Sequence, residues 1–363
     1  MLDKVELRIG GKKIEHFERY SIEGHLYTAD HAWSMELANP VGGINPGQLV
    51  EVWINGLREL AGIADCVGLY YVKKGRVLRI EGRDLMGYLV DSCCTAFPTL
   101  KGMTLKALAQ TLLEQVPKQF RTVMNVTYQE NMVGRLKLKK GKKGSIQNAD
   151  EQNPQAYSQI EPGMTIFEVL REYAHSRGLL FWCDTDGSFT FGRPRAAGGP
   201  KYNIVTRISR AAQGLRDGQG NNAIAGELIQ NISRRYSECI ITGQQQGTDS
   251  LTAAEINTMA TKRDETFPFY KPLVRRNNND ASSPALEARM ELEKRKAEGF
   301  ALRYTVAGHS QNGTNWRINE MTRVTDEVLG INGSYLIYGR TFIFDRDYGP
   351  QTELVLGYPG IIE

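Results

Sequence analysis

Short runs of alternating apolar and polar residues, divided by turn-forming residues, are the feature that most constrains this chain. Val5, Leu7 and Ile9 alternate with charged residues, and the same period of two returns at residues 50–54 and 77–81. This is the period of a strand with one buried and one wetter face. Glycine accounts for 37 of the 363 residues, which supplies frequent turns. The pattern therefore predicts small antiparallel barrels or sandwiches at both ends of the chain.

Composition and charge narrow the class of protein. Hydrophobic residues make up 41% and charged residues 24%, which are ordinary values for a globular protein of two or three domains. The net charge of +4 is too small to indicate a dedicated nucleic-acid binder. The first residues read as a strand, so we expect no secretory signal, and the apolar runs are far shorter than the roughly 20 residues that cross a bilayer.

The cysteines argue for a reducing cytoplasm as the place of synthesis. The chain has five, an odd number without a CxxC pair, which is untypical of a disulfide framework or a structural zinc site. They are Cys66, Cys93, Cys94, Cys183 and Cys239. Cys239 lies within an apolar alternation, which predicts a buried free thiol.

The middle of the chain has helical spacing. Leucines from residue 105 onward recur at helical intervals after Thr104, a predicted N-cap. A second helix is predicted to begin at Thr165, where Thr165 and Glu168 form a capping box. A hairpin turning at Asp186-Gly187 should follow.

Strand patterns return after residue 201. They are interrupted by a stretch at 244–283 that we expect to be irregular, and by a short helix predicted near 284–298.

Motifs for chemistry are weak. The string GQGNNA, with Gly218, Gly220 and Ala223, matches a relaxed dinucleotide fingerprint, but its polar, Gly-rich approach favours a flexible loop. The string GKKGS lacks the spacing of a phosphate loop, and no GxSxG elbow nominates a nucleophilic serine. None of the five histidines forms a metal-binding cluster with another. We therefore expect no cofactor, no metal and no enzymatic activity.

Clustered basic residues are the one electrostatic feature. The segment GRLKLKKGKKGS, residues 134–145, is predicted to be an exposed loop, and it could attract a phosphate backbone without reading sequence or simply be solvated. Arg234 and Arg235 form a weaker candidate of the same kind. The residues predicted to face DNA are Lys137, Lys139, Lys140, Lys142, Lys143, Arg234 and Arg235.

Three stretches, in order, resemble the Mu-like phage 43 kDa tail protein, the baseplate hub family of contractile tails. The first includes GQLVEVWING at 47–56 and RIEGRDLMGYLVDSC at 79–93. The second is PGMTIFEVLREYAHSRGLLFWCDTDGSFTFGRP at 162–194, and the third includes SYLIYGRTFIFDRDYGPQTELVLGYP at 334–359. Within the GRD turn of the first, we interpret Arg83 and Asp84 as an Arg–Asp pair or an Asp turn cap that fixes a strand, in preference to a contact role.

The resemblance implies a mainly β, α+β fold with two similar antiparallel β-barrel domains and a helix-containing middle domain. The predicted domains are residues 1–95, 96–200 and 201–363, the last with a helical insertion near 284–298. It further implies a homotrimer that joins the sixfold tail tube to a threefold central spike and passes DNA without sequence recognition. The expected location is the virion tail baseplate, after synthesis in the bacterial host cytoplasm. Two alternatives stay open: a tail-associated cell-wall hydrolase, and a hub or spike component of a contractile secretion system.

Overall fold

A computed structural model gives the architecture. It describes residues 3–38, 42–73, 75–98, 104–121, 126–128, 160–175, 178–194, 198–208, 220–244, 257–276 and 284–360. Strands dominate over helices, 50% against 17%, which confirms the predicted mainly β, α+β class. None of the described helices is both long and apolar enough to cross a membrane.

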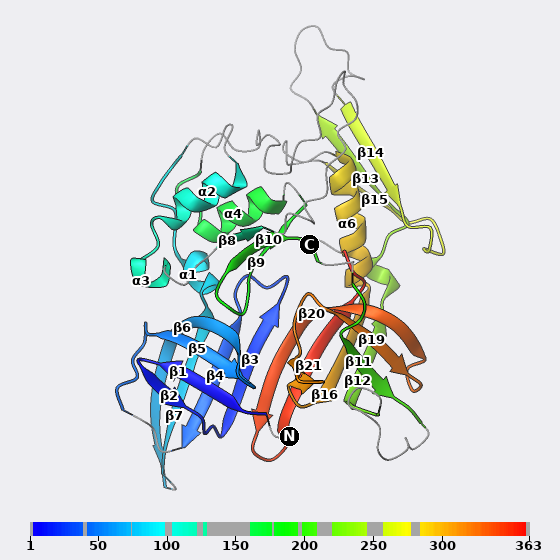
Figure 1. Ribbon diagram of the computed structural model, residues 1–363. Coiled ribbons are helices and arrows are strands. Elements are labelled where there is room, and N and C mark those ends of the chain that lie inside the picture. Colours follow the sequence, from blue (N-terminus) through cyan, green and yellow to red (C-terminus); the bar gives the residue numbers. More distant parts are fainter. Residues whose placement is uncertain are drawn as a thin grey trace.

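The N-terminal end forms an antiparallel β unit, blue in Figure 1. Its strands are β1 (Val5–Ile9), β2 (Lys12–Ile14), β3 (Arg19–His25), β4 (Ala32–Ala38), β5 (Leu49–Ile54), β6 (Leu57–Val72) and β7 (Gly75–Asp84). They pair in the order β3-β4-β7-β6-β5-β1-β2. Burial alternates along β3, β4 and β5, as the period of two in the sequence predicts. One face of this unit therefore lines a hydrophobic core.

The C-terminal end forms a second β unit. Its main strands are β11 (Tyr202–Thr206), β12 (Ala223–Gln230), β16 (Phe300–Ala307), β19 (Met321–Asp326), β20 (Ile331–Asp345) and β21 (Gly349–Gly357). A small hairpin of β17 (Ser310–Gln311) and β18 (Thr314–Asn315) accompanies them. The order β12-β16-β21-β20 is antiparallel throughout, and β11 joins the edge of β19 in parallel.

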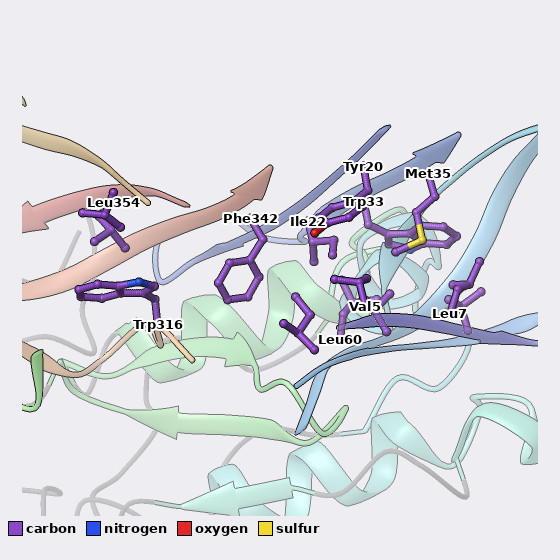
Figure 2. Packing of buried hydrophobic residues seen from close by; sticks show 14 of the residues in the cluster. Val5, Leu7, Tyr20, Ile22, Trp33, Met35, Leu60, Trp316, Phe342 and Leu354 are labelled. Carbon is purple, nitrogen blue, oxygen red and sulfur yellow. The ribbon is translucent and has the colours of Figure 1, made fainter. Parts of the chain in front are cut away.

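The long strand β20 joins the two units into one 13-stranded sheet. Its first part pairs with β19 and its second part pairs with β3, from Gly339 opposite His25 to Asp345 opposite Arg19. One hydrophobic cluster runs through both units; in Figure 2, Phe342 lies with Ile22 and Leu60 on one side and Trp316 on the other. The sheet is continuous, and no closed barrel is found in the described part of the chain, so the two barrels stay a prediction.

The middle of the chain packs helices on a small sheet. Its elements are α1 (Met86–Asp91), α2 (Leu105–Leu113), α3 (Lys118–Arg121), β8 (Val126–Tyr128), α4 (Ile166–His175), β9 (Leu180–Cys183) and β10 (Phe189–Gly192). The Thr104 hydroxyl accepts from the Ala107 amide at 3.1 Å, which confirms that N-cap. Glu168 and Thr165 exchange the two bonds of the predicted capping box, at 2.8 and 3.1 Å.

An insertion between β12 and β16 forms a third sheet beside a helix. It contains the 3₁₀ turn η1 (Ile232–Arg234), then β13 (Glu238–Gln244), β14 (Asn257–Arg263), β15 (Pro272–Arg276) and α6 (Pro284–Glu298). Helix α6 confirms the helix predicted near 284–298 and lies along this sheet (Figure 1). The expectation that 244–283 is irregular was wrong for β14 and β15. The alternation of apolar and polar residues that predicts a strand is weak here, because β15 is largely exposed and both strands carry polar residues.

Candidate assembly surfaces

The residues predicted to face DNA have different outcomes. The five lysines, Lys137, Lys139, Lys140, Lys142 and Lys143, lie outside the described residues. Arg234 is exposed at the end of η1. Arg235, in contrast, donates to Asp264 Oδ2 at 2.7 Å and to Thr266 Oγ1 at 3.0 Å. Arg235 therefore serves an ion pair within the insertion, and a DNA-facing role for this set stays a prediction.

The GRD turn is a structural joint. Asp84 Oδ1 accepts from the Met86 amide at 3.0 Å, so Asp84 caps the turn into α1, which confirms the turn-cap interpretation. Its Oδ2 atom lies 2.8 Å from His31 Nδ1, and His31 Nε2 lies 2.8 Å from the His25 carbonyl oxygen. Both ring nitrogens thus face acceptors, an arrangement that favours the imidazolium form of His31.

The neighbouring Arg83 forms ion pairs with three carboxylates, none of which is that of Asp84. Its guanidinium lies 3.1 Å from Asp30, 2.8 Å from Asp65 and 2.5 Å from Asp91. These acids come from the β3–β4 connection, from β6 and from α1. Arg83 therefore fastens the first β unit to the start of the helical region, and the predicted pair of Arg83 with Asp84 is replaced by pairs with these three acids.

A buried ion pair crosses the junction of the two β units. Arg340 Nη2 on β20 lies 3.0 Å from Glu59 Oε2 on β6, and both side chains are almost fully enclosed, at 2% and 0% exposure. Asn315 Nδ2 donates to the other Glu59 oxygen at 2.8 Å. The guanidinium carbon lies 3.9 Å from the Phe342 ring centre. Burial lowers the pKa of Arg340, which Glu59 opposes. This enclosed pair holds the two units in register.

The dinucleotide-like string does not form a phosphate site. Ala223 begins strand β12, so no helix N-terminus follows the glycines as that mechanism requires. Asn222 uses its side chain to accept from the Val205 amide and to donate to the Asn203 carbonyl. Gly218 lies outside the described residues. In the part of the chain that the structure describes, no three His, Cys, Asp or Glu side chains are grouped to hold a metal ion.

Two surfaces stand out because they carry large apolar side chains that remain exposed in the folded chain. The first is the hairpin tip, which we define as residues 66–73 and 75–76 at the ends of β6 and β7; its Leu69, Tyr70 and Tyr71 are 61%, 56% and 87% exposed. The second is the β12 edge, defined as residues 223–230, where Ile224 and Ile229 are 55% and 45% exposed. Clustered exposed apolar side chains of this kind mark surfaces for other molecules.

A third exposed group lies on the insertion. Phe269 and Tyr270 are 55% and 73% exposed on the connection from β14 to β15. The Phe269 ring packs edge-on against Phe267 at 4.9 Å between ring centres, and Tyr270 bonds to Glu238 at 3.1 Å. Both residues therefore make contacts within the insertion itself, which account in part for their positions. None of the three surfaces was predicted from the sequence, although the run Leu69-Tyr70-Tyr71 visibly breaks the alternation of apolar and polar residues.

Family models match both ends of the chain. Residues 4–84 match the family described as Mu phage baseplate assembly protein GpP-like, N-terminal. Residues 294–361 match the tail protein C-terminal domain of the NMB1110-like family. A search of curated proteins found no match.

Solved structures match the whole chain. The crystal structure of the tail protein from Neisseria meningitidis MC58 is 26% identical, with a TM-score of 0.75 over 100% of this chain and 98% of that one. The 43 kDa tail protein of prophage MuSo2 from Shewanella oneidensis is 20% identical, with a TM-score of 0.76 over 99% and 100%. These matches confirm the resemblance that the three sequence stretches predicted.

A more distant structure shares the fold. It is a component of the Escherichia coli type VI secretion system, 12% identical, with a TM-score of 0.59 over 98% of this chain and 79% of that one. That protein is described as structurally similar to the tail proteins gp27 and gp5 of bacteriophage T4. The architecture of this chain therefore occurs both in phage tails and in a secretion machine.

Proposed function

Because its N-terminal residues match a Mu phage baseplate family and its C-terminal residues match a tail protein domain, we propose that this chain is a structural baseplate hub subunit of a contractile phage tail. In this role it forms a homotrimeric ring that joins the tail tube to the central spike. The ring encloses the channel through which DNA passes without sequence recognition. Its place is the virion tail baseplate, after synthesis in the host cytoplasm.

The observation that carries the proposal is the pair of antiparallel β units, one at each end of the chain, held together by β20. Two such units in each of three subunits give six, which matches the sixfold symmetry of a tail tube to a threefold spike. Head-to-tail contacts of one chain with the next close into a ring when the rotation allows it. We further propose that each of the two units closes into a barrel. The proposed domains are residues 1–95, 96–200 and 201–363.

The proposal assigns no catalytic step. The ion pairs described above join parts of the fold: His31 with Asp84, Arg83 with three acids, and Arg340 with Glu59. Incubation of the purified protein with peptidoglycan should release no soluble fragments. Release that a single carboxylate substitution abolishes would instead support the cell-wall hydrolase considered from the sequence.

The ring is tested by the mass of the native protein. Sedimentation velocity and native mass spectrometry at micromolar concentration should give a trimer of the 40.7 kDa chain. Binding of the ring to spike and tube proteins encoded beside it should then follow in pull-down assays. A stable monomer at all concentrations up to the millimolar range would reject the hub proposal.

A hub of a contractile secretion system is the second candidate. It is favoured by the shared fold with the Escherichia coli secretion component. The two candidates predict the same ring and differ in their neighbours. Genes for capsid and tail assembly beside this one support the phage tail, and genes for a secretion sheath and its ATPase support the secretion machine.

A further inference from the structure

We propose that the hairpin tip of one copy packs against the β12 edge of the next copy, and that this is the contact repeated around the ring. The inference rests on the proposed ring and adds the two surfaces that would meet. Both surfaces belong to exposed strands with an open edge and exposed apolar side chains.

The hairpin tip offers an open strand edge with an apolar face. Among the described residues, β5 pairs with β6 only as far as Ile63, and beyond that point β7 is the single paired neighbour of β6. Leu69 stands opposite the buried Leu78, so Leu69 continues the core-facing side of the hairpin outward. Tyr71 lies two residues further along the same side and is 87% exposed. This apolar face therefore extends past the core that covers the rest of the hairpin.

The β12 edge offers a second open strand of similar length. In the described chain, β12 pairs with β16 and with no other strand. Its exposed side chains are mostly small or apolar, and its one charged residue, Glu227, pairs with Arg303 at 2.7 Å. Proteins usually protect such an edge with inward charges, proline or a covering loop. An edge of this kind is suited to receive another strand by β-addition.

The charges of the two surfaces are complementary. Lys73 and Arg76 are exposed at the hairpin tip. Glu327 in the turn after β19 is exposed beside the β12 edge, where Leu329 of the same turn approaches Gly226, whereas Glu227 is already paired with Arg303. Basic groups on the hairpin tip and an acidic group beside the β12 edge favour a mixed contact over a contact of either surface with itself.

The positions of the two surfaces fit a ring. Figure 1 shows the β6–β7 hairpin at the lower left and β12 on the right of the molecule. In the strand order, β12 is the end strand of the second unit, and β6 and β7 belong to the first unit. A contact between unlike surfaces on opposite sides leaves one of each surface free on every dimer. Such a contact continues from copy to copy until the ring closes.

Two substitutions and a mixing experiment test the contact. Tyr71→Glu places a carboxylate on the hairpin tip, and Ile229→Glu places one on the β12 edge; both positions are exposed, so the monomer should keep its fold. The self-association of each variant alone, measured by sedimentation velocity, should be weaker than that of the wild type by about ten-fold or more. Val274→Glu is the matched control, because Val274 is 61% exposed on the insertion and outside both surfaces. The control should assemble like the wild type.

Mixing separates a head-to-tail contact from the alternatives. The Tyr71→Glu chain keeps its β12 edge and the Ile229→Glu chain keeps its hairpin tip, so an equimolar mixture retains one intact contact. We expect heterodimers and no ring. If the hairpin tip paired with itself, Ile229→Glu alone would still assemble and the proposal would be wrong. If the wild type and both variants form the same ring, the contact lies elsewhere while the hub proposal stands. A monomeric wild type would overturn both.

Discussion

At the scale of single residues, the His31–Asp84 pair makes the stability of the protein depend on pH. Burial by itself would lower the pKa of His31, but the Asp84 carboxylate and the His25 carbonyl raise it above 6.5. A raised pKa means that the pair stabilises the fold fully below the pKa of the unfolded chain. This contribution is lost as pH rises through the pKa of the folded protein.

We expect His31→Gln to lower the free energy of unfolding by about 3 kcal/mol at pH 6, because it leaves Asp84 buried without its cation. The difference from the wild type should shrink steadily above pH 7. Burial lowers the pKa of His25 and of His309 to about 4 in the folded protein, so both change the absolute stability as they titrate in the unfolded chain, but they do so equally in the wild type and the variant and cancel from the difference. Urea unfolding of the wild type and the variant between pH 6 and 9 measures this difference in stability. His16→Gln, at an exposed position, is the control. A difference that is constant with pH would show that His31 is neutral.

The buried pair of Arg340 and Glu59 predicts a strong dependence of each residue on the other. Arg340→Met alone should cost about 3–5 kcal/mol, because it leaves an unpaired carboxylate in the core. Adding Glu59→Leu to the same chain should recover most of that loss, since a well-packed apolar pair is often as stable as a buried ion pair. Chemical unfolding of the two single variants and the double variant measures the coupling. Additive losses would mean that the two side chains act independently.

At the scale of elements, two glycines allow the paired strands β6 and β7 to approach each other closely. A Cβ atom on Gly82 would lie 1.9 Å from the Ile63 carbonyl oxygen, and one on Gly62 would lie 2.2 Å from that of Arg83. The pairing of β6 with β7 also shifts register between Ala64 and Cys66. These strands therefore bend at a point where backbone meets backbone and a side chain has no room.

Gly82→Ala should lower stability by about 3 kcal/mol or more, because backbone must move to admit the methyl group. Gly199→Ala is the control: no atom lies within 4 Å of its Cβ position, and its stability should change by less than about 0.5 kcal/mol. Thermal unfolding of the two variants measures both values. Equal melting temperatures would contradict the close approach of β6 and β7 at Gly82.

Elements with local signals could be predicted, and pairings between distant residues could not. Thr165 with Glu168, and the turn at Asp186-Gly187, are set by neighbours a few residues away, and the structure has both. The pairing of β3 with β20 joins residues more than 300 positions apart, so nothing in either local pattern specifies it. The same holds for the assembly surfaces. Whether Leu69 and Ile229 are exposed depends on which strands cover them, which only the tertiary structure decides.

At the scale of the whole molecule, the shared core predicts that the two β units unfold together. Phe342 on β20 pairs with Ile22 on β3, and its ring lies 4.8 Å from that of His309, which in turn bonds to the Tyr20 hydroxyl at 2.7 Å. The core of each unit is thus completed by side chains of the other. Hydrophobic contacts of this kind couple the stabilities of the parts that make them.

We therefore expect Phe342→Ala to cost about 3–5 kcal/mol and to weaken amide protection in both units equally. Hydrogen exchange followed by mass spectrometry measures this on peptides from β4 and from β21, neither of which contains the substituted residue. Leu108→Ala is the matched control, since Leu108 is equally buried in the separate cluster around α2 and α4. It should weaken protection around α2 first. If Phe342→Ala left the β4 amides as protected as in the wild type, the two ends would be independent domains, and the ring would have to hold six separate bodies in place. If both ends weaken together, each chain unfolds as one body, which is what the proposed adaptor between a tube and a spike requires.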